Sequence, residues 1–309
     1  MTLMDNPTRS KINKIHFIGI GGSGMSGIAE VLVNLGYEIS GSDIQSTDAT
    51  EKLEKLGCTI NYSQKAENVS GKQAVVVSSA INKNNPELQE ARYQKLLIVP
   101  RAEMLGELMR FRFGIAVSGT HGKTTTTSLI VDIMSEAKLD PTYIIGGIIN
   151  ATGMNAKLGN SDYLIAEADE SDASFLHLQP MLSVITNIDE DHMSTYSHNY
   201  AKLTEAFISF TSNLPFYGIC VACIDDKGVQ DILKKIHRPI LSYGFSREAD
   251  VKASNISQDK MKMKFDVSCH KYQKNFPVSL NLIGKHNILN ALAAISIAIE
   301  LDINIIDIQ

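Results

Sequence analysis

The stretch FGIAVSGTHGKTTTT, at residues 113–127, carries the clearest structural signal in the chain. Phe113 to Val117 is apolar and predicts a buried strand, and an amphipathic helix is predicted over Ser128 to Lys138. A strand, a glycine turn and Lys-Thr before a helix form the layout of a phosphate-binding loop. In such a loop, backbone N–H groups and the positive end of the helix hold phosphate oxygens.

Two side chains of this loop have predicted roles. Lys123 is expected to reach the terminal phosphates, and the Thr124 hydroxyl is placed to ligate Mg²⁺. The usual loop has a further glycine where this chain has Val117, so the loop is shortened to G-x-x-G-K-T. The alternative is a glycine-rich turn that carries a surface lysine. Four consecutive threonines are poor helix formers, which counts against that alternative.

A second glycine loop lies near the N-terminus. Gly19-Ile20-Gly21-Gly22-Ser23-Gly24 matches G-x-G-x-x-G between a predicted strand and a predicted helix, and Asp43 ends the next strand. In this context a diphosphate binds the helix N-terminus and the acid binds ribose hydroxyls. Alone, the motif suggests an NAD-dependent dehydrogenase or a purely structural turn. A UDP-sugar supplies the same diphosphate and hydroxyls, and the second phosphate loop favours two nucleotide ligands over hydride transfer.

Polar residues also follow three later predicted strands. Ser78-Ser79-Ala80 ends one strand, where hydroxyls could bind phosphate, although serines are common there. The strand from Tyr163 runs into AEADESD (166–172), whose crowded carboxylates repel one another unless a cation such as Mg²⁺ holds them; a solvated acidic loop is the alternative. The strand Leu182 to Asn187 leads to His192, which is a candidate metal ligand or an ordinary loop residue.

The segment GKHNILN (284–290) opens the last predicted helix. Asn287 and Asn290 lie three residues apart and therefore share a helical face. Their amides can read the edge of a nucleotide base through paired donor and acceptor contacts. Helix capping alone would explain one of the two asparagines but not both.

Composition limits the class of protein and its partners. The net charge of −5 argues against nucleic-acid binding, and the sequence has no long apolar run for a membrane span. The N-terminus lacks the apolar stretch of a secretory signal, which predicts a cytoplasmic protein. Cys220 and Cys223 form a C-x-x-C pair, but they lie in an apolar run and are predicted to be core residues.

The order of predicted elements indicates an α/β protein of two domains. Residues 1–109 are predicted to form a Rossmann-like domain with a parallel sheet. Residues 110–309 are predicted to form a P-loop ATPase-type α/β domain. Three antiparallel edge strands are expected between residues 250 and 282.

Together, GIGGSGMSG, GTHGKTTTT, AEADESD, DHM and GKHNILNAL occur in an order that resembles the ATP-dependent Mur ligases of peptidoglycan synthesis. Within that family, the sequence motifs most resemble those of the member that joins L-alanine to UDP-N-acetylmuramate. The resemblance implies a UDP-substrate domain and a central ATPase domain. It also implies that the family's C-terminal domain is absent here, so the chain resembles a truncated ligase that could be inactive alone.

The resemblance carries functional roles onto individual positions, with ATP and Mg²⁺ as cofactors. The catalytic residues are Lys123, Glu167 and His192, and the Mg²⁺ ligands are Thr124, Glu167 and His192. The nucleotide-binding positions are Gly119, Thr120, His121, Gly122, Lys123, Thr124, Thr125, His286, Asn287 and Asn290. The UDP-substrate positions are Gly21, Gly22, Ser23, Gly24, Met25, Ser26, Asp43, Ser78, Ser79 and Ala80.

The implied partners are the two small substrates, with no nucleic acid and no membrane. Several relatives hold a second metal with a carbamylated lysine, but this chain has Ala206-Phe207 at the expected distance. A muropeptide-recycling Mur-type ligase and a non-catalytic nucleotide-binding module remain as alternatives.

Overall fold

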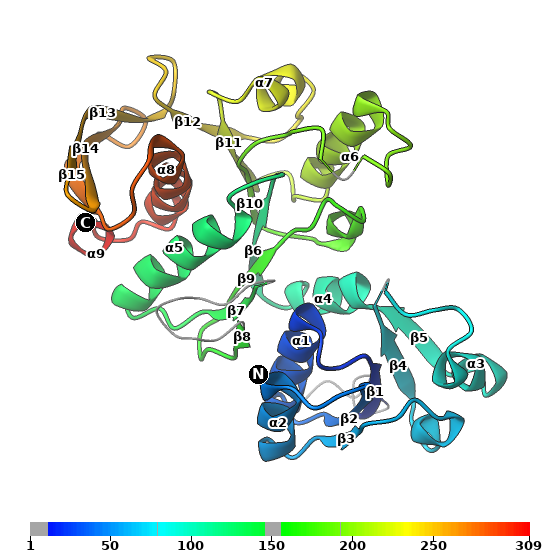
Figure 1. Ribbon diagram of the computed structural model, residues 1–309. Coiled ribbons are helices and arrows are strands. Elements are labelled where there is room, and N and C mark those ends of the chain that lie inside the picture. Colours follow the sequence, from blue (N-terminus) through cyan, green and yellow to red (C-terminus); the bar gives the residue numbers. More distant parts are fainter. Residues whose placement is uncertain (1–11, 79, 146–155, 192) are drawn as a thin grey trace. The chain divides into compact units, whose positions relative to one another are not determined.

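The computed structural model describes residues 12–78, 80–145, 156–191 and 193–309 (Figure 1). The chain divides into two compact units. Unit 1 comprises Met1–Phe111 with Tyr143–Leu158, and unit 2 comprises Arg112–Thr142 with Gly159–Gln309. The sequence analysis assigned all of residues 110–309 to the second domain, whereas the segment Tyr143–Leu158 clusters with the first. Its strands, β7 (Thr142–Ile144) and β8 (Ala156–Lys157), pair in antiparallel fashion, and β8 packs beside α1.

Unit 1 is built on a parallel sheet in the order β3-β2-β1-β4-β5, which is the order of a Rossmann fold. The strands are β1 (Lys14–Ile18), β2 (Glu38–Ser42), β3 (Thr59–Asn61), β4 (Ala74–Val77) and β5 (Leu97–Pro100). The strand order reverses between β1 and β4, and ligands of open α/β sheets bind outside the carboxyl ends at such a point. The predicted Rossmann-like sheet is confirmed.

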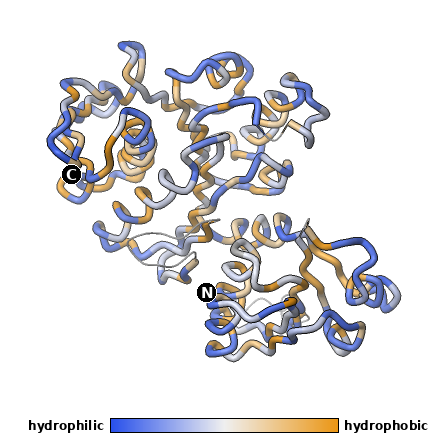
Figure 2. Tube along the Cα trace, viewed as in Figure 1, coloured by the Kyte–Doolittle hydropathy of each residue, from blue (hydrophilic) through white to orange (hydrophobic). Residues whose placement is uncertain are grey.

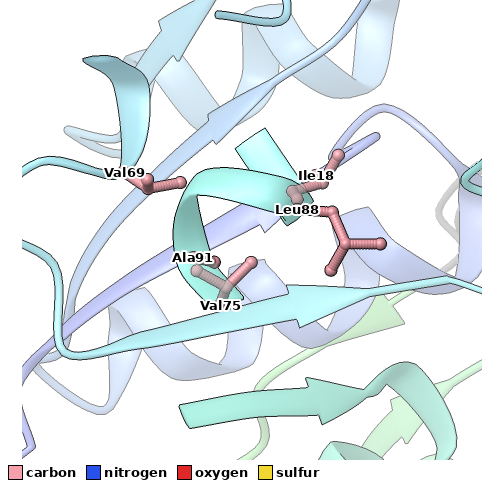
Figure 3. Close-up of a cluster of buried hydrophobic side chains, with 5 residues drawn as sticks. All are labelled: Ile18, Val69, Val75, Leu88 and Ala91. Carbon is pink, nitrogen blue, oxygen red and sulfur yellow. The ribbon is translucent and has the colours of Figure 1, made fainter. Parts of the chain in front are cut away.

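The helices of unit 1 alternate with its strands along the chain. They are α1 (Ser23–Asn34), α2 (Asp48–Lys55), the 3₁₀ helix η3 (Ala66–Val69), α3 (Pro86–Tyr93) and α4 (Arg101–Met109). Thr47 caps α2 through a capping box with Thr50, and Asn85 caps α3, whose first residue is a proline. Figure 3 shows part of the core, where Ile18 and Val75 of the sheet pack with Leu88, Ala91 and Val69.

Unit 2 contains a mixed sheet in the order β15-β14-β13-β12-β11-β10-β6-β9. The strands are β6 (Phe113–Ser118), β9 (Tyr163–Glu167), β10 (Leu182–Ile185), β11 (Ile219–Cys223), β12 (Ile240–Gly244), β13 (Val251–Asp259), β14 (Lys262–Cys269) and β15 (Lys274–Leu280). The pairs that join β9, β6, β10, β11, β12 and β13 are parallel. The pairs β13–β14 and β14–β15 are antiparallel, as predicted. Hydrophobic residues follow the central strands (Figure 2).

The helices of unit 2 are α5 (Lys123–Glu136), the 3₁₀ helix η4 (Ser174–His177), α6 (Tyr200–Ser212), α7 (Lys227–Leu233), α8 (Lys285–Glu300) and α9 (Ile305–Ile308). Among them, α5, α7 and α8 pack against this sheet. The prediction that the helix after the phosphate loop begins at Ser128 is wrong, because α5 begins at Lys123. Thr126 and Thr127 are fully buried, and α5 packs along α8 (Figure 1), so tertiary burial outweighs the low helix propensity of threonine.

All four cysteines are free and buried, and Cys220 and Cys223 lie in β11, as predicted for core residues. Burial raises the pKa of the Cys220 thiol to about 12 and that of Cys223 to about 11. Among the described residues, no helix combines the length and apolar character needed to cross a membrane.

Candidate functional site

The phosphate loop joins β6 to α5 through two glycines with left-handed backbones. Gly119 has φ +127° and Gly122, which immediately precedes α5, has φ +86°. A Cβ at Gly119 would lie 2.0 Å from Thr186 Oγ1, and one at Gly122 would lie 2.4 Å from Asn290 Oδ1. Both positions therefore require glycine for two reasons, backbone conformation and space.

Residues that follow β10 hold the loop in shape. Thr186 Oγ1 donates to the carbonyl of His121 at 2.7 Å and to that of Ser118 at 3.2 Å. The Asn187 amide donates to the His121 carbonyl at 2.9 Å and accepts from the His121 N–H at 2.8 Å. The sequence analysis did not identify Thr186 and Asn187 as loop partners. The sequence showed only that both residues lie at the end of a predicted strand, which did not reveal that this strand pairs with β6.

Lys123, the first residue of α5, is held from two sides. Its Nζ donates to the Gly119 carbonyl at 2.7 Å and to Glu170 Oε2 at 2.8 Å. The Glu170 side chain is 4% exposed and that of Lys123 is 17% exposed, so this ion pair is largely shielded from water. The structure therefore brings the acidic segment to the phosphate loop, and Glu170 is the residue that contacts the lysine.

Tyr196 anchors the same acidic segment. Its hydroxyl donates to the backbone carbonyl of Glu170. Burial, followed by the nearby charges of Glu170, Asp172 and Asp169, raises the pKa of Tyr196 far above its usual value. The phenol is therefore neutral and keeps its proton for this hydrogen bond.

Of the three predicted Mg²⁺ ligands, the structure describes Thr124 and Glu167. Glu167 ends β9, where it pairs in register with Val117 of β6, and Thr124 is the second residue of α5. Both thus lie at the carboxyl edge of the sheet beside the phosphate loop, whereas His192 lies outside the described residues. Within the described part of the chain, no group of three or more His, Cys, Asp or Glu side chains forms a metal cluster. Mg²⁺ commonly takes one or two carboxylates with phosphate and water oxygens, so this sparse set of oxygen donors fits Mg²⁺.

A cavity of about 370 Å³ opens beside the loop within unit 2. It is lined by His121, Gly122, Thr186, Asn187, Cys223, Asp225, Asp226, Tyr243, His286, Leu289 and Asn290. The predicted base-contacting residues His286 and Asn290 therefore line one cavity with the phosphate loop. Asn287 contributes indirectly, because its Oδ1 accepts a hydrogen bond from Asn290 Nδ2 at 3.2 Å.

Asp225, Asp226 and Tyr243 are cavity residues that the sequence analysis missed. Asp226 Oδ1 accepts from the N–H groups of Val229 and Ile188, so its carboxylate caps α7. Burial raises the pKa of Asp226 above its ordinary value. The only sequence signal for Asp225 and Asp226 was the end of the β11 strand, which resembles any strand-to-helix turn, whereas Tyr243 lies within β12.

One histidine lies within the loop and a second lies at the start of α8. His121 is exposed, and its Nε2 lies 3.3 Å from Asp191 Oδ2. His286 is exposed at the start of α8. Thr120 is tied to the same region, because the backbone N–H of Asp189 donates to its Oγ1 at 2.8 Å.

In unit 1 the first glycine loop joins β1 to α1. Gly19 has φ +76°, and its N–H and that of Ile20 donate to the Ser42 carbonyl. Asp43 Oδ2 accepts from the Gly21 N–H at 2.8 Å, and a Cβ at Gly21 would lie only 2.8 Å from that oxygen. Asp43, predicted to bind ribose hydroxyls, thus also fixes the conformation of the loop.

Of the remaining predicted UDP-substrate positions, those that the structure describes lie at the same edge of unit 1. Gly22 is the N-cap of α1, and Met25 and Ser26 are buried in its first turn. Ser78 and Ala80 follow β4, while Ser79 lies outside the described residues. Ser23 begins α1, and its side chain also lies outside the description.

Arg101 is a cation near this loop that the sequence analysis did not select. A Cβ placed on Gly24 would lie 2.9 Å from Arg101 Nη1, so the guanidinium lies against the start of α1. Glycine at position 24 leaves the room for it. The only sequence signal was a basic residue at the start of a helix.

A Rossmann-like unit and a P-loop unit, each with a glycine loop at the carboxyl edge of its sheet, define a class of protein that binds two phosphate-bearing ligands. Residues 14–113 match the profile "Mur ligase family, catalytic domain", and residues 117–298 match "Mur ligase middle domain". The chain belongs to the Mur ligase family.

Two curated relatives carry the name UDP-N-acetylmuramate–L-alanine ligase. The protein of Vesicomyosocius okutanii subsp. Calyptogena okutanii (strain HA) is 64% identical over 301 residues, which cover 97% of this chain and 64% of the relative. The protein of Ruthia magnifica subsp. Calyptogena magnifica is 63% identical over 295 residues, which cover 96% of this chain and 63% of the relative. The chain therefore spans less than two thirds of the length of these relatives.

Solved structures give the same family. A UDP-N-acetylmuramate-alanine ligase from Thermotoga maritima superposes with a TM-score of 0.82 at 28% identity, over 96% of this chain and 66% of that chain. The UDP-N-acetylmuramate:L-alanyl-gamma-D-glutamyl-meso-diaminopimelate ligase from Neisseria meningitides superposes with a TM-score of 0.85 at 26% identity, over 96% and 95% of the two chains.

Proposed function

We propose that this chain forms the UDP-substrate-binding and ATP-binding units of a ligase that joins L-alanine to UDP-N-acetylmuramate in peptidoglycan synthesis. The observation that carries the proposal is the 64% identity to a UDP-N-acetylmuramate–L-alanine ligase along 97% of the chain. The proposed cofactors are ATP and Mg²⁺. The phosphate loop and the oxygen donors beside it support both.

The proposed reaction activates a carboxylate. The γ-phosphoryl group of ATP passes to the lactyl carboxylate of the sugar substrate, which forms an acyl phosphate and ADP. The neutral amine of L-alanine then attacks the acyl carbon and loses one proton to solvent as the amide forms, and inorganic phosphate leaves with the electron pair of the broken C–O bond. Phosphoryl transfer needs mainly in-line positioning and charge neutralisation.

The chain's own residues divide this work. The N–H groups of Gly122 to Thr125, at the start of α5, would bind the phosphates, because those of Thr120 and His121 already donate to Asn187. Lys123 would neutralise the charge that develops on the transferred group. Thr124, Glu167 and His192 would hold Mg²⁺, which supplies charge neutralisation between the phosphates when bound. The cavity beside the loop, with His286 and Asn290, would take the base.

On the sugar-nucleotide side, the proposal assigns the diphosphate to the N-terminus of α1. The N–H groups of Ser23 and Gly24 lie there, whereas those of Met25 and Ser26 donate to the Gly22 carbonyl. Arg101 adds positive charge against Gly24. Asp43 remains the proposed ribose contact. Ser78 and Ala80 lie at the end of β4, at the reversal of strand order where such ligands bind.

A muropeptide-recycling ligase is the alternative proposal, since the Neisseria meningitides ligase superposes on this chain. Its identity is 26%, against 64% for the alanine ligase of Vesicomyosocius okutanii, and the difference favours L-alanine over a preformed peptide. A non-catalytic nucleotide-binding module is the other alternative.

Calorimetric titration and a coupled ADP assay test the proposal together. UDP-N-acetylmuramate and a non-hydrolysable ATP analogue should each bind the chain with one-to-one stoichiometry, and NADH should not bind. ADP release should require both UDP-N-acetylmuramate and L-alanine. No binding of the sugar nucleotide, or ADP release that is indifferent to both substrates, would contradict the proposal. Release with the tripeptide L-alanyl-γ-D-glutamyl-meso-diaminopimelate but not with L-alanine would favour the recycling ligase.

A further inference from the structure

A fully buried polar cluster lies in unit 1, beneath the edge of the sheet that carries the first glycine loop. Its members are His16 of β1, Ser40 and Ser42 of β2, and Glu87 of α3, and none of them is more than 2% exposed. The side chains of the cluster are therefore shielded from water. A carboxyl group in such surroundings is costly unless it is hydrogen-bonded.

Glu87 is bound from several elements. Its Oε2 accepts from Ser42 Oγ at 2.6 Å, and its Oε1 accepts from Asn68 Nδ2 at 2.5 Å. His16 Nε2 lies 3.5 Å from Oε1, and His16 Nδ1 lies 3.0 Å from Ser40 Oγ. The Glu87 N–H is capped by Asn85 Oδ1. The carboxylate therefore joins β2 to α3 and η3 at one fixed point.

Ser42 connects this point to the glycine loop. Its carbonyl accepts the N–H groups of Gly19 at 2.8 Å and Ile20 at 3.0 Å. The next residue, Asp43, accepts the N–H of Gly21 with its carboxylate. Three successive N–H groups of the loop thus bond to the end of β2, and the Ser42 hydroxyl bonds that end to Glu87.

We propose that Glu87 is a positioning residue for the UDP-substrate site, which acts through Ser42 to hold the first glycine loop in its ligand-binding conformation. The inference rests on the proposed function of that loop. Glu87 does not touch the ligand in this proposal. A loop whose N–H groups are fixed in advance loses less conformational entropy when a diphosphate binds.

Ser42→Ala removes the hydroxyl that donates to Glu87 and leaves the backbone of β2 in place, so it tests the link between Glu87 and the glycine loop directly. Affinity for UDP and for UDP-N-acetylmuramate should fall about tenfold, which corresponds to about 1.4 kcal/mol. Glu87→Gln is the second variant. It should also weaken UDP binding, because both Ser42 and Asn68 donate to the head group and a glutamine has only one acceptor oxygen.

Ser40→Ala is the matched control. Ser40 lies two residues earlier on β2, faces the same cluster and is 2% exposed. Its hydroxyl lies 3.0 Å from His16 Nδ1 and, among the described residues, forms no hydrogen bond to Glu87 or the loop. This variant should bind UDP as the wild type does. Hydrogen exchange of the Gly19–Gly21 amides should be faster in Ser42→Ala than in Ser40→Ala, and the affinity for ATP in unit 2 should be unchanged in all three variants.

The outcomes separate the two proposals. If the wild-type chain fails to bind UDP-N-acetylmuramate, the proposed function is wrong. If the wild type binds and Ser42→Ala and Glu87→Gln bind equally well with unchanged amide exchange, the positioning role is wrong. An equal loss of UDP affinity in Ser40→Ala would also overturn it, because general core packing would then explain the effect.

Discussion

At Gly122 the backbone turns into the first residue of α5 with φ +86°, and the space beside its Cα is filled by Asn290. Gly122→Ala adds about 1–2 kcal/mol of left-handed strain and forces a shift of the Asn290 amide, 2.4 Å from the new Cβ. Affinity for ATP should fall by at least about tenfold, as measured by calorimetry.

Gly71→Ala is a suitable control for this substitution. Gly71 has φ +70°, and nothing lies within 4 Å of a Cβ built there. It should therefore show a similar cost in the free energy of unfolding without any loss of ATP affinity. Equal ATP affinity in the wild type and Gly122→Ala would contradict the steric argument.

Lys123 and Glu170 form the second residue-scale test. Lys123→Ala should abolish phosphoryl transfer and leave Glu170 buried without its cation, which costs about 3 kcal/mol of stability. The double variant Lys123→Ala/Glu170→Gln should recover much of the free energy of unfolding but none of the transfer activity. UDP-substrate binding should be intact in both variants. Chemical denaturation and the ADP assay measure the two effects, and equal stability of the single and double variants would refute the buried pair.

The sequence predicted residues whose role depends on local pattern. Gly119, Gly122 and Lys123 form a motif within five positions. The left-handed backbone at the two glycines is a conformation that glycine adopts readily, so the turn could be expected from the sequence. Thr186 and Asn187 could not be predicted in the same way. Their partners are carbonyls that lie far away in sequence, and only the pairing of β10 with β6 brings them together.

At the scale of elements, the N-cap of α7 is the partly buried carboxylate of Asp226, and burial makes its charged form less stable. Burial raises the pKa of Asp226 in the folded chain above the ordinary 3.8. The folded state therefore holds more bound protons than the unfolded state between the two pKa values. It follows that the free energy of unfolding falls as the pH rises from below 3.8 through that interval.

Asp226→Asn keeps an oxygen for the Val229 and Ile188 N–H groups and removes the charge. Relative to the wild type, this variant should gain stability as the pH rises above 3.8, and the two should respond alike at lower pH. Relative to Asp226→Asn, Asp226→Ala should lose about 1 kcal/mol at every pH, because the cap itself is lost. Urea denaturation at several pH values gives these differences, and parallel curves for Asp226→Asn and the wild type would contradict the assignment.

The elements themselves were predicted unevenly for physical reasons. The strands β13 to β15 have one buried and one exposed face, and that alternation was visible in the sequence. The start of α5 was misplaced, because threonine has low helix propensity and burial against α8 is a tertiary effect. The pair β7 and β8 was missed because its strands span three and two residues, too short for a periodic pattern.

For the whole molecule, the two units place the two proposed ligands on separate cores. The native cysteines report on each core, since Cys58 lies in unit 1 and Cys220, Cys223 and Cys269 lie in unit 2. Burial raises the pKa of the Cys58 thiol to about 11, and each of the four reacts as a thiolate only after its surroundings open. A thiol reagent in mild urea therefore measures the opening of each unit separately.

A ligand that binds only the folded state stabilises it by about 2.7 kcal/mol at a hundred times its Kd. At that concentration, UDP-N-acetylmuramate should slow labelling of Cys58 by up to about a hundredfold and leave the three cysteines of unit 2 nearly unchanged. The ATP analogue should give the reverse pattern, and peptide mass spectrometry resolves the four sites. Equal protection of all four cysteines by either ligand would show that the units open as one, and protection of Cys58 by the ATP analogue alone would show that the two ligands are assigned to the wrong units.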